Sequence, residues 1–161
     1  MGGIAHLRPA AVAIGSNLGD RRAHLDWAVE RLSRLLGSLK VSAYHDTEPV
    51  DVGPQPVFLN ACVVGTFEGS PRALLGALHA LEQERGRERP YAGAARTLDL
   101  DLILLGDEVI DEPDLVVPHP RFRQRAFVLE PLASIAPDLV DPVTGRTVDA
   151  LWRACVNARQ G

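Results

Sequence analysis

The 161-residue sequence predicts an α+β fold, and three observations support this. Four segments have the apolar alternation or short apolar runs of strands, and two segments have the apolar spacing of helices. Along the chain these six segments follow the order β-α-β-β-α-β. That order is typical of the ferredoxin-like core, in which two helices cover one face of an antiparallel four-stranded sheet.

The first half of this core occupies residues 10–45. Residues 10–14, Ala-Ala-Val-Ala-Ile, predict a short strand. Apolar residues then recur at helical spacing from Arg21 to Leu36, and Gly37 is a helix-stop signal. Residues 39–45 predict the second strand.

The second half follows a loop rich in Pro and Gly. Residues 57–67 predict a long strand. Ser70 is a favourable N-cap and Pro71 a favourable first helical residue, so a second helix is expected from there to about Gly86. After another loop, alternating leucines predict the last strand at residues 98–105.

Residues 106–161 predict a helical extension over the other face of the sheet. A Pro-rich connection leads to a short helix at 121–130, and Thr147 caps a last helix. This layer would bury Ile103 and Leu105, and the inward side of its last helix would carry Val148, Leu151, Trp152 and Cys155. Because no repeat or linker interrupts the chain, residues 1–161 are expected to form one domain.

The composition argues against several classes of protein. Apolar residues make up 46% and charged residues 24%, as in ordinary soluble domains, and the net charge is −4. A negative charge disfavours binding to nucleic acid or to a membrane surface. No segment has the ~20 apolar residues of a membrane span, so a cytoplasmic protein, expected to be a monomer, is predicted. Cys62 and Cys155 lack metal-ligand spacing and are expected to be reduced and to serve packing.

Two carboxylates interrupt the apolar strand Arg96-Thr-Leu-Asp-Leu-Asp-Leu-Ile-Leu-Leu105. The leucines alternate, so Asp99 and Asp101 share the opposite face, roughly 6.5 to 7 Å apart. Two like charges in an apolar setting are unfavourable, so a positive partner is expected. The pattern alone leaves three candidates, which are Arg96, water at the end of the strand, and a metal ion.

A loop rich in arginine precedes this strand. Residues 82–96 contain Arg85, Arg87, Arg89 and Arg96, with Gly86 and Gly93 to loosen the chain. Guanidinium groups bind phosphate in bidentate fashion, although pairing with nearby glutamates is an alternative. Beside the two aspartates, the loop indicates a phosphate and Mg²⁺ site. The only lysine is Lys40, which excludes a P-loop.

Three further segments could bind ligands. His119, Arg121, Arg123 and Arg125 crowd together with Phe122 and Phe127 in residues 117–127, where they could face an anion or serve as ordinary polar and core residues. In Gly15-Ser-Asn-Leu-Gly-Asp20, helix capping by Asn17 or Asp20 is favoured over anion binding. Asn60 lies within an apolar strand, two residues after Phe58, as either a structural bridge or a reader of a flat heterocycle.

Taken together, these segments closely resemble the 6-hydroxymethyl-7,8-dihydropterin pyrophosphokinase family of the folate pathway. The resemblance covers nearly the whole chain and lies in four motifs in the right order: Ala-Ile-Gly-Ser-Asn-Leu-Gly-Asp (13–20), Phe-Leu-Asn-Ala (58–61), Arg-Thr-Leu-Asp-Leu-Asp-Leu-Ile-Leu (96–104) and Val-Pro-His-Pro-Arg (117–121). It implies transfer of the terminal diphosphate of ATP to the pterin hydroxymethyl group, with release of AMP.

The resemblance also implies roles for individual residues. Asp99 and Asp101 would hold two Mg²⁺ ions on the triphosphate, and Arg87 and Arg96 would neutralise the migrating phosphoryl groups. The ATP site would further contain Glu82, Leu102, His119 and Arg125. The pterin ring would stack between Phe58 and Phe127, and its edge would meet Asn60 and the backbone of Thr47, Glu48 and Val50.

The chain departs from the family pattern in one place. Relatives usually have Arg-Trp-Gly-Pro-Arg before the aspartate motif, whereas this chain has Ala92-Gly-Ala-Ala-Arg96. The resemblance therefore implies a loop that is less ordered over bound nucleotide, with Tyr91 as a shifted candidate for the missing aromatic residue.

Two other classes of function are compatible with the motifs. A phosphohydrolase could use the same aspartates with water as acceptor, and a ferredoxin-like regulatory module could bind a ligand without turnover. The paired carboxylates next to an arginine loop disfavour the module, and product analysis separates hydrolysis from transfer.

Overall fold

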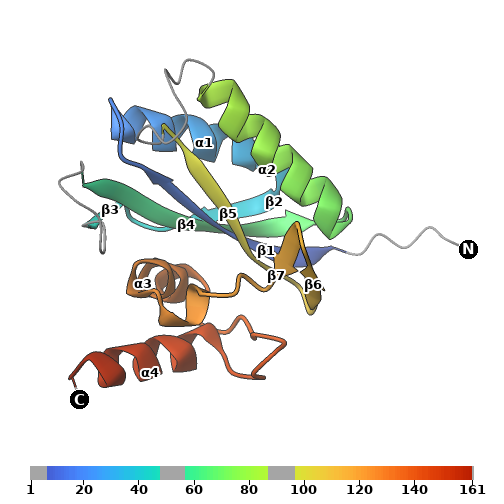
Figure 1. The fold of residues 1–161 in the computed structure, drawn as a ribbon, viewed down its shortest axis with the longest axis vertical. Coiled ribbons are helices and arrows are strands. Elements are labelled where there is room, and N and C mark those ends of the chain that lie inside the picture. Colours follow the sequence, from blue (N-terminus) through green and yellow to red (C-terminus); the bar gives the residue numbers. More distant parts are fainter. Residues whose placement is uncertain (1–6, 48–56, 87–96, 161) are drawn as a thin grey trace, which may run out of the picture.

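A computed structural model describes residues 7–47, 57–86 and 97–160, and its centre is an antiparallel sheet (Figure 1). Across the sheet the strands lie in the order β2-β4-β1-β5, and each is hydrogen-bonded to its neighbours in this order. Strand β3 also pairs with β4. They are β1 (Arg8–Ser16), β2 (Gly37–Val41), β3 (His45–Thr47), β4 (Phe58–Phe67) and β5 (Asp99–Leu105). This is the strand order of the predicted ferredoxin-like core, which is confirmed.

Two helices, α1 (Arg21–Leu35) and α2 (Pro71–Arg85), cover one face of the sheet (Figure 1). Each begins at a side-chain cap, because the Ala23 N–H donates to Asp20 at 3.1 Å and the Ala73 N–H donates to Ser70 at 3.1 Å. The expected capping roles of Asp20 and Ser70 are confirmed. The core beneath the helices contains fully buried residues such as Leu25, Leu32, Leu74 and Leu78.

A second layer covers the opposite face. It consists of a 3₁₀ helix (Phe122–Gln124), α3 (Ala126–Ile135) and α4 (Val148–Gln160), and Figure 1 shows α3 and α4 on the side away from α1 and α2. Thr147 caps α4 as expected, accepting from the Ala150 N–H at 3.1 Å. Val148 and Leu151 are buried in the second core, and Trp152 and Cys155 pack against it.

The predicted strand at 39–45 is instead two strands, β2 and β3, both paired with β4. The break has a local cause, because the Cys62 N–H donates to the Ser42 hydroxyl at 2.9 Å rather than to a backbone carbonyl. The predicted helix at 121–130 is also wrong in its bounds. A 3₁₀ turn comes first, and α3 then continues past Pro131 because Leu132 on its inner side is buried in the second core.

Strand β5 does not alternate along its whole length. Leu102 lies opposite Val12 and Leu104 lies opposite Ala11, so Ile103 is an extra residue that forms a β-bulge. The bulge turns Leu104 to the second core and Leu105 to the first, the reverse of the predicted faces. Before the bulge the alternation holds, so Asp99 and Asp101 keep their shared face.

A hairpin of β6 (Ile110–Glu112) and β7 (Leu115–Val117) occupies part of the predicted Pro-rich connection. Arg72 at the start of α2 holds this hairpin through ion pairs with Glu112 and Asp114. Among the described residues, none of the helices combines the length and apolar character that crossing a membrane requires.

Candidate active site

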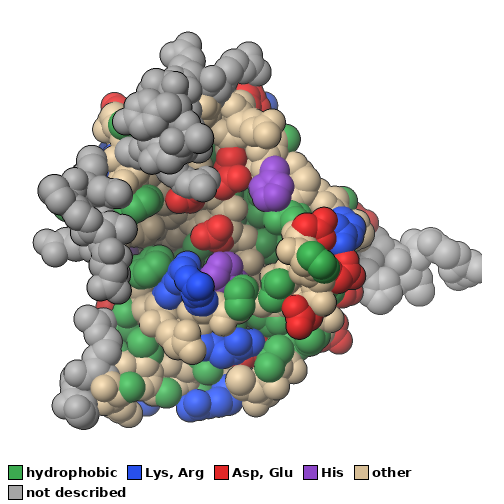
Figure 2. All heavy atoms as spheres, in the orientation of Figure 1, with side chains coloured by type: hydrophobic (Ala, Val, Ile, Leu, Met, Phe, Trp, Pro, Cys, Tyr) green, Lys and Arg blue, Asp and Glu red, His purple; other side chains and the backbone are tan. Residues whose placement is uncertain are grey.

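A pocket of about 450 Å³ opens beside the edge of β5 that faces away from β1. Figure 2 shows acidic and histidine side chains around a hollow on this face, with arginines next to them. The lining comes from α2, β5, β7 and the segment that follows β7, namely Leu75, His79, Glu82, Asp99, Leu100, Asp101, Leu102, Asp114, Leu115, Val116, His119 and Arg125. Six of the predicted ATP and metal residues therefore meet here: Glu82, Asp99, Asp101, Leu102, His119 and Arg125.

The two aspartates lie on the face of the sheet that α3 and α4 partly cover. Asp99 is half-buried and Asp101 is exposed. The sequence suggested a covered position for both, but the second layer packs on Ile103 and not on the start of β5. Two acidic groups can therefore stand side by side with access to solvent and to a ligand.

Glu82 adds a third acid from the last turns of α2. Its carboxylate accepts a hydrogen bond from the Leu100 backbone N–H at 2.7 Å. Because Leu100 pairs with β1 on its other side, this bond ties α2 to the open edge of β5. Burial raises the pKa of Glu82, and the charges of Asp99 and Asp101 raise it further. The hydrogen bond from the Leu100 N–H opposes this rise in pKa. Three acidic side chains thus lie close together in the pocket.

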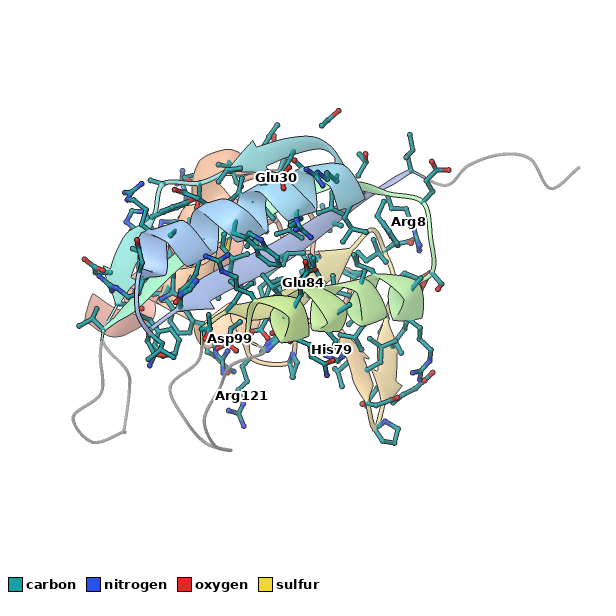
Figure 3. The ribbon with its side chains drawn as sticks, turned by 90° about the horizontal axis from the view of Figure 1, so that it is seen from above. Arg8, Glu30, His79, Glu84, Asp99 and Arg121 are labelled. Atoms are coloured by element: carbon teal, nitrogen blue, oxygen red, sulfur yellow. The ribbon has the colours of Figure 1, made fainter. Side chains whose placement is uncertain are left out.

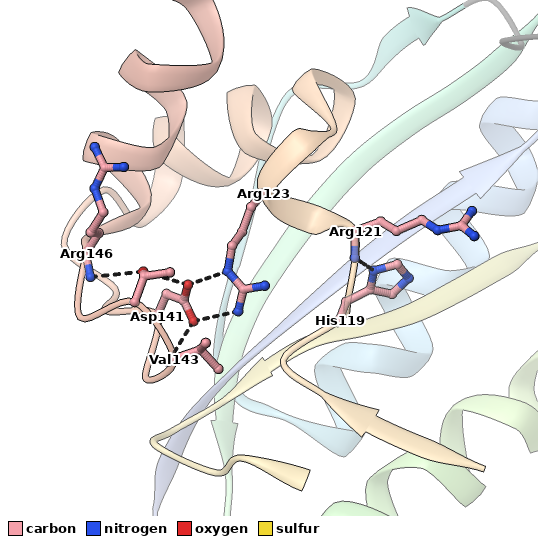
Figure 4. A network of polar contacts seen from close by, with 7 residues as sticks. His119, Arg121, Arg123, Asp141, Val143 and Arg146 are labelled. Atoms are coloured by element: carbon pink, nitrogen blue, oxygen red, sulfur yellow. Dashed lines mark hydrogen bonds and ion pairs between the residues drawn. The ribbon is translucent and has the colours of Figure 1, made fainter. Parts of the chain in front are cut away.

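His119 lines the same pocket and interacts electrostatically with Asp101. Its backbone N–H donates to the Ile103 carbonyl at 2.9 Å, which holds the segment along β5 beyond the bulge. Burial lowers the pKa of His119, with Arg125 and Arg121 lowering it and Asp101 opposing them, so the imidazole is neutral at pH 7. Nδ1 accepts from the Arg121 N–H at 3.1 Å (Figure 4), which leaves the ring proton on Nε2.

Figure 3 shows Asp99 and Arg121 on the side of α2 that carries His79, and Asp99 and His79 both line the pocket. Arg125, which also lines the pocket, places its guanidinium 5.5 Å from the centre of the Phe127 ring. Phe127 is 36% exposed at the start of α3, a high value for a large apolar side chain. This ring is therefore available to a flat ligand next to the pocket.

Asn60 and Asp99 belong to one row across the sheet. Gly15 in β1 lies opposite Asn60 in β4 and opposite Asp99 in β5. Directly opposed residues project to the same face, and two strand spacings put the outer Cα atoms roughly 10 Å apart. A Cβ on Gly15 would lie 2.6 Å from the Asn60 Oδ1 and 3.6 Å from Phe58. The glycine thus leaves room for the side chains of Asn60 and Phe58. The Asn60 amide also donates a hydrogen bond to the Thr47 hydroxyl.

Comparison with known proteins identifies the family of the chain. A family model described as 7,8-dihydro-6-hydroxymethylpterin-pyrophosphokinase (HPPK) matches residues 11–137. The chain belongs to the HPPK family. It is 41% identical over 146 residues to the 2-amino-4-hydroxy-6-hydroxymethyldihydropteridine pyrophosphokinase of Pseudomonas aeruginosa, covering 89% of this chain and 90% of that protein. The Bacillus subtilis protein of the same name is 39% identical over 142 residues, covering 87% and 85%.

Solved HPPK structures support the same fold. Wild-type Plasmodium falciparum HPPK-DHPS has a TM-score of 0.74 at 16% identity, over 96% of this chain and 46% of that chain. The same protein with SDX-DHP has a TM-score of 0.75 at 15% identity, over 96% and 45%. This chain therefore spans less than half the length of those solved chains. As an HPPK-family member it is a pyrophosphokinase, and the phosphohydrolase alternative finds no support.

Several predicted HPPK residues cannot be located. Arg87, Arg96, Glu48 and Val50 lie outside the described residues, as does the variant loop at 92–95 with Tyr91. Conversely, the pocket contains residues that sequence reasoning missed. Leu75 and His79 share a helical stripe with Glu82, at spacings of four and three, which could have revealed them. Asp114, Leu115 and Val116 of the hairpin carried no comparable signal.

Proposed function

We propose that the pocket holds ATP, that the face beside it holds 6-hydroxymethyl-7,8-dihydropterin, and that the chain transfers the terminal diphosphate between them. The observation that carries this proposal is the row Asn60–Gly15–Asp99 across three strands. The Asn60 amide can donate to and accept from the edge of a heterocycle. The row places it close enough to Asp99 and Asp101 for one substrate to contact both.

The nucleotide side is supported by the lining of the pocket. Leu75, Leu102 and Leu115 offer an apolar surface for a base, whereas His119 and Arg125 offer donors to phosphate oxygens. Neutral His119 would donate from Nε2. Arg87 and Arg96, from the loop between α2 and β5, are proposed to neutralise charge on the migrating groups.

The donor set also fits Mg²⁺. This ion takes oxygen ligands and is commonly bound by one or two carboxylates together with substrate phosphates and water. Asp99 and Asp101 supply such a pair, and the described residues contain no group of three or more His, Cys, Asp or Glu arranged to hold a metal. Bound Mg²⁺ would neutralise triphosphate charge. Binding of two ions remains part of the proposal.

The pterin side is supported by exposed rings and an amide. Phe58 lies on the same side of β4 as Asn60, and Phe127 presents its ring from the start of α3. We propose that the pterin stacks between the two rings and that Asn60 reads its edge, with Thr47 holding the amide in place. Glu48 and Val50 are proposed to add backbone contacts.

Positioning and charge stabilisation suffice for the reaction, so no strong base is required. The pterin hydroxyl oxygen attacks the β phosphorus of ATP and loses its proton to solvent. The bond between the β phosphorus and the oxygen that bridges to the α phosphate breaks, and AMP leaves. The carboxylate pair and the arginines would hold the reacting atoms in line and stabilise the charge that moves to the leaving oxygen.

A single incubation tests the proposed function. With ATP, Mg²⁺ and the hydroxymethyl pterin, we expect AMP and a pterin diphosphate in equal amounts, measured by chromatography. Omitting the pterin should abolish AMP release. ADP or free phosphate as the main product would refute the transfer and revive hydrolysis.

Replacing Gly15 with Ala tests the pterin site. The added methyl group would meet the Asn60 Oδ1 at 2.6 Å and displace the amide. Loss of an amide's hydrogen bonds costs about 1–3 kcal/mol, so the pterin KM should rise about tenfold or more while the ATP KM stays the same. Gly76→Ala is the matched control, because a Cβ there meets nothing within 4 Å. An unchanged pterin KM in Gly15→Ala would place the pterin elsewhere.

The cytoplasmic location, the monomeric state, the single-domain organisation and the weaker ordering of the variant loop remain predictions.

A further inference from the structure

The loop between α3 and α4 contains a fully buried acid, Asp141, which is not among the residues that line the pocket. Its carboxylate receives two hydrogen bonds from Arg123, at 2.5 and 3.0 Å (Figure 4). It also accepts from the Val143 N–H at 3.0 Å and from the Thr144 hydroxyl at 2.8 Å. All the lone pairs that a buried carboxylate must satisfy are therefore engaged by this chain.

The ionised state of this acid is secured by its partners. Burial alone would raise the pKa of Asp141, but the hydrogen bonds from Arg123, Thr144 and Val143 outweigh that effect and hold the pKa below its usual range. Backbone hydrogen bonds also close the loop. The Asp141 N–H donates to the Arg146 carbonyl at 2.8 Å, and the Gly145 N–H donates to the Asp141 carbonyl at 2.8 Å. Asp141 is thus a negatively charged side chain held by several hydrogen bonds.

Arg123 lies in the middle of the turn that supplies the pocket. The turn places three arginines in five residues, at 121, 123 and 125, so their charges repel one another. A single 3₁₀ turn has little stability of its own. Arg125 precedes α3 without any side-chain cap bond, and its N–H donates to Phe122 at 3.2 Å. The position of Arg125 consequently depends on what holds the preceding turn.

Two contacts hold that turn from the side away from the pocket. Phe122 is fully buried in the second core, and Arg123 is clamped by Asp141. On the other side, His119 and Arg125 line the pocket. Neutralising the central arginine removes a repulsion that would otherwise push Arg125 away from its place.

We propose that Asp141 is a positioning residue for ATP, acting through Arg123 to hold Arg125 in the nucleotide pocket. This inference rests on the proposed function, because it assumes that the pocket takes ATP. It assigns a role in substrate binding to a residue that touches neither substrate.

The test replaces Asp141 with Asn, which keeps the size and an oxygen acceptor but removes the charge. Binding of a non-hydrolysable ATP analogue with Mg²⁺ should weaken about tenfold or more, as expected when a charge-assisted contact is misplaced. Pterin affinity should change by less than about threefold, because Phe127 is placed by the buried side of α3. Both are measured at a temperature where near-ultraviolet circular dichroism shows each protein folded.

Asp149→Asn is the matched control, since it breaks an ion pair with Arg153 on the exposed side of α4. Neither affinity should change in that variant. If Asp141→Asn does not fold, Arg123→Lys replaces it, because lysine keeps the charge but cannot make the two-pronged contact. It should weaken nucleotide binding in the same direction.

A double-mutant cycle separates positioning from general stability. If Asp141 acts through Arg125, then adding Asp141→Asn to Arg125→Ala should weaken ATP binding by less than about twofold further. Full additivity, or unchanged nucleotide affinity in folded Asp141→Asn, would overturn the inference and leave the proposed function intact. A wild-type protein that binds no ATP analogue and forms no AMP would instead overturn the proposed function, and this inference with it.

Discussion

Replacing Asp101 with Asn is expected to lower turnover by roughly 10²–10³-fold or more, the range for loss of one group that stabilises charge in a transition state. Asn keeps the shape of the side chain and one oxygen but removes a negative charge from the proposed Mg²⁺ site. The weaker site would bind the metal–triphosphate complex poorly. Initial rates of AMP formation across a range of Mg²⁺ concentrations measure the effect.

The same variant should fold normally without metal. Asp101 is exposed and stands beside Asp99 on one face of β5, so removing its charge relieves repulsion rather than breaking a buried contact. The melting temperature in metal-free buffer should therefore be unchanged or slightly higher. Added Mg²⁺ and an ATP analogue should stabilise the wild type more than the variant.

The control is Asp111→Asn, an exposed acid in the hairpin strand β6, which should change neither rate nor melting. A structural role for Asp101 predicts the opposite pattern. A variant that melts early in metal-free buffer yet retains catalysis would show that the aspartate serves the fold and not the metal.

Local signals in the sequence were enough for most of the fold. Ser70 with Pro71, and Thr147, each mark a helix start by a short-range hydrogen bond, and the structure places helices there. The β-bulge at Ile103 could not be predicted in the same way. In the run Leu102-Ile-Leu-Leu105 every residue is apolar, so the pattern is equally consistent with either face, and only the pairing with β1 decides.

The residues of the candidate site likewise fall into two groups, those that local sequence signals indicate and those that depend on the tertiary fold. Asp99 and Asp101 could be paired from alternation within one strand, and the resemblance named Glu82, His119 and Arg125, which meet at one pocket. Gly15 was considered only as part of a turn, because its place between Asn60 and Asp99 depends on the register of three strands. The contact of Arg123 with Asp141 likewise joins segments 18 residues apart through a fold that no local rule supplies.

For Phe127 the sequence left two roles open, a core aromatic residue or a ring that faces a ligand. Phe122 is fully buried in the second core, whereas Phe127 is 36% exposed beside Arg125. Two rings of the same size, five positions apart, therefore occupy opposite environments. Truncating each one should separate stability from pterin binding.

Phe122→Ala is expected to lower the free energy of unfolding by about 3–5 kcal/mol, because it removes a buried ring and leaves a cavity. For a chain of this size each kcal/mol shifts the midpoint by about 2–4 °C, so the melting temperature should fall by roughly 6–20 °C. Chemical denaturation with an unchanged slope would confirm a two-state loss of stability. A loss below about 1 kcal/mol would mean that the second core closes over the gap.

Phe127→Ala should give the reverse result. Its ring already contacts solvent, so truncation should shift the melting temperature by only a few degrees, at about 2–4 °C per kcal/mol. If the ring stacks on the pterin, affinity for the pterin should fall about tenfold, since an aromatic pair contributes about 0.5–1.5 kcal/mol beyond the apolar area it buries. Phe127→Tyr should restore binding, because it restores the ring. Pterin affinity that survives in Phe127→Ala while the protein loses as much stability as Phe122→Ala would show that this ring is a second structural anchor, and the stacking model would have to be abandoned.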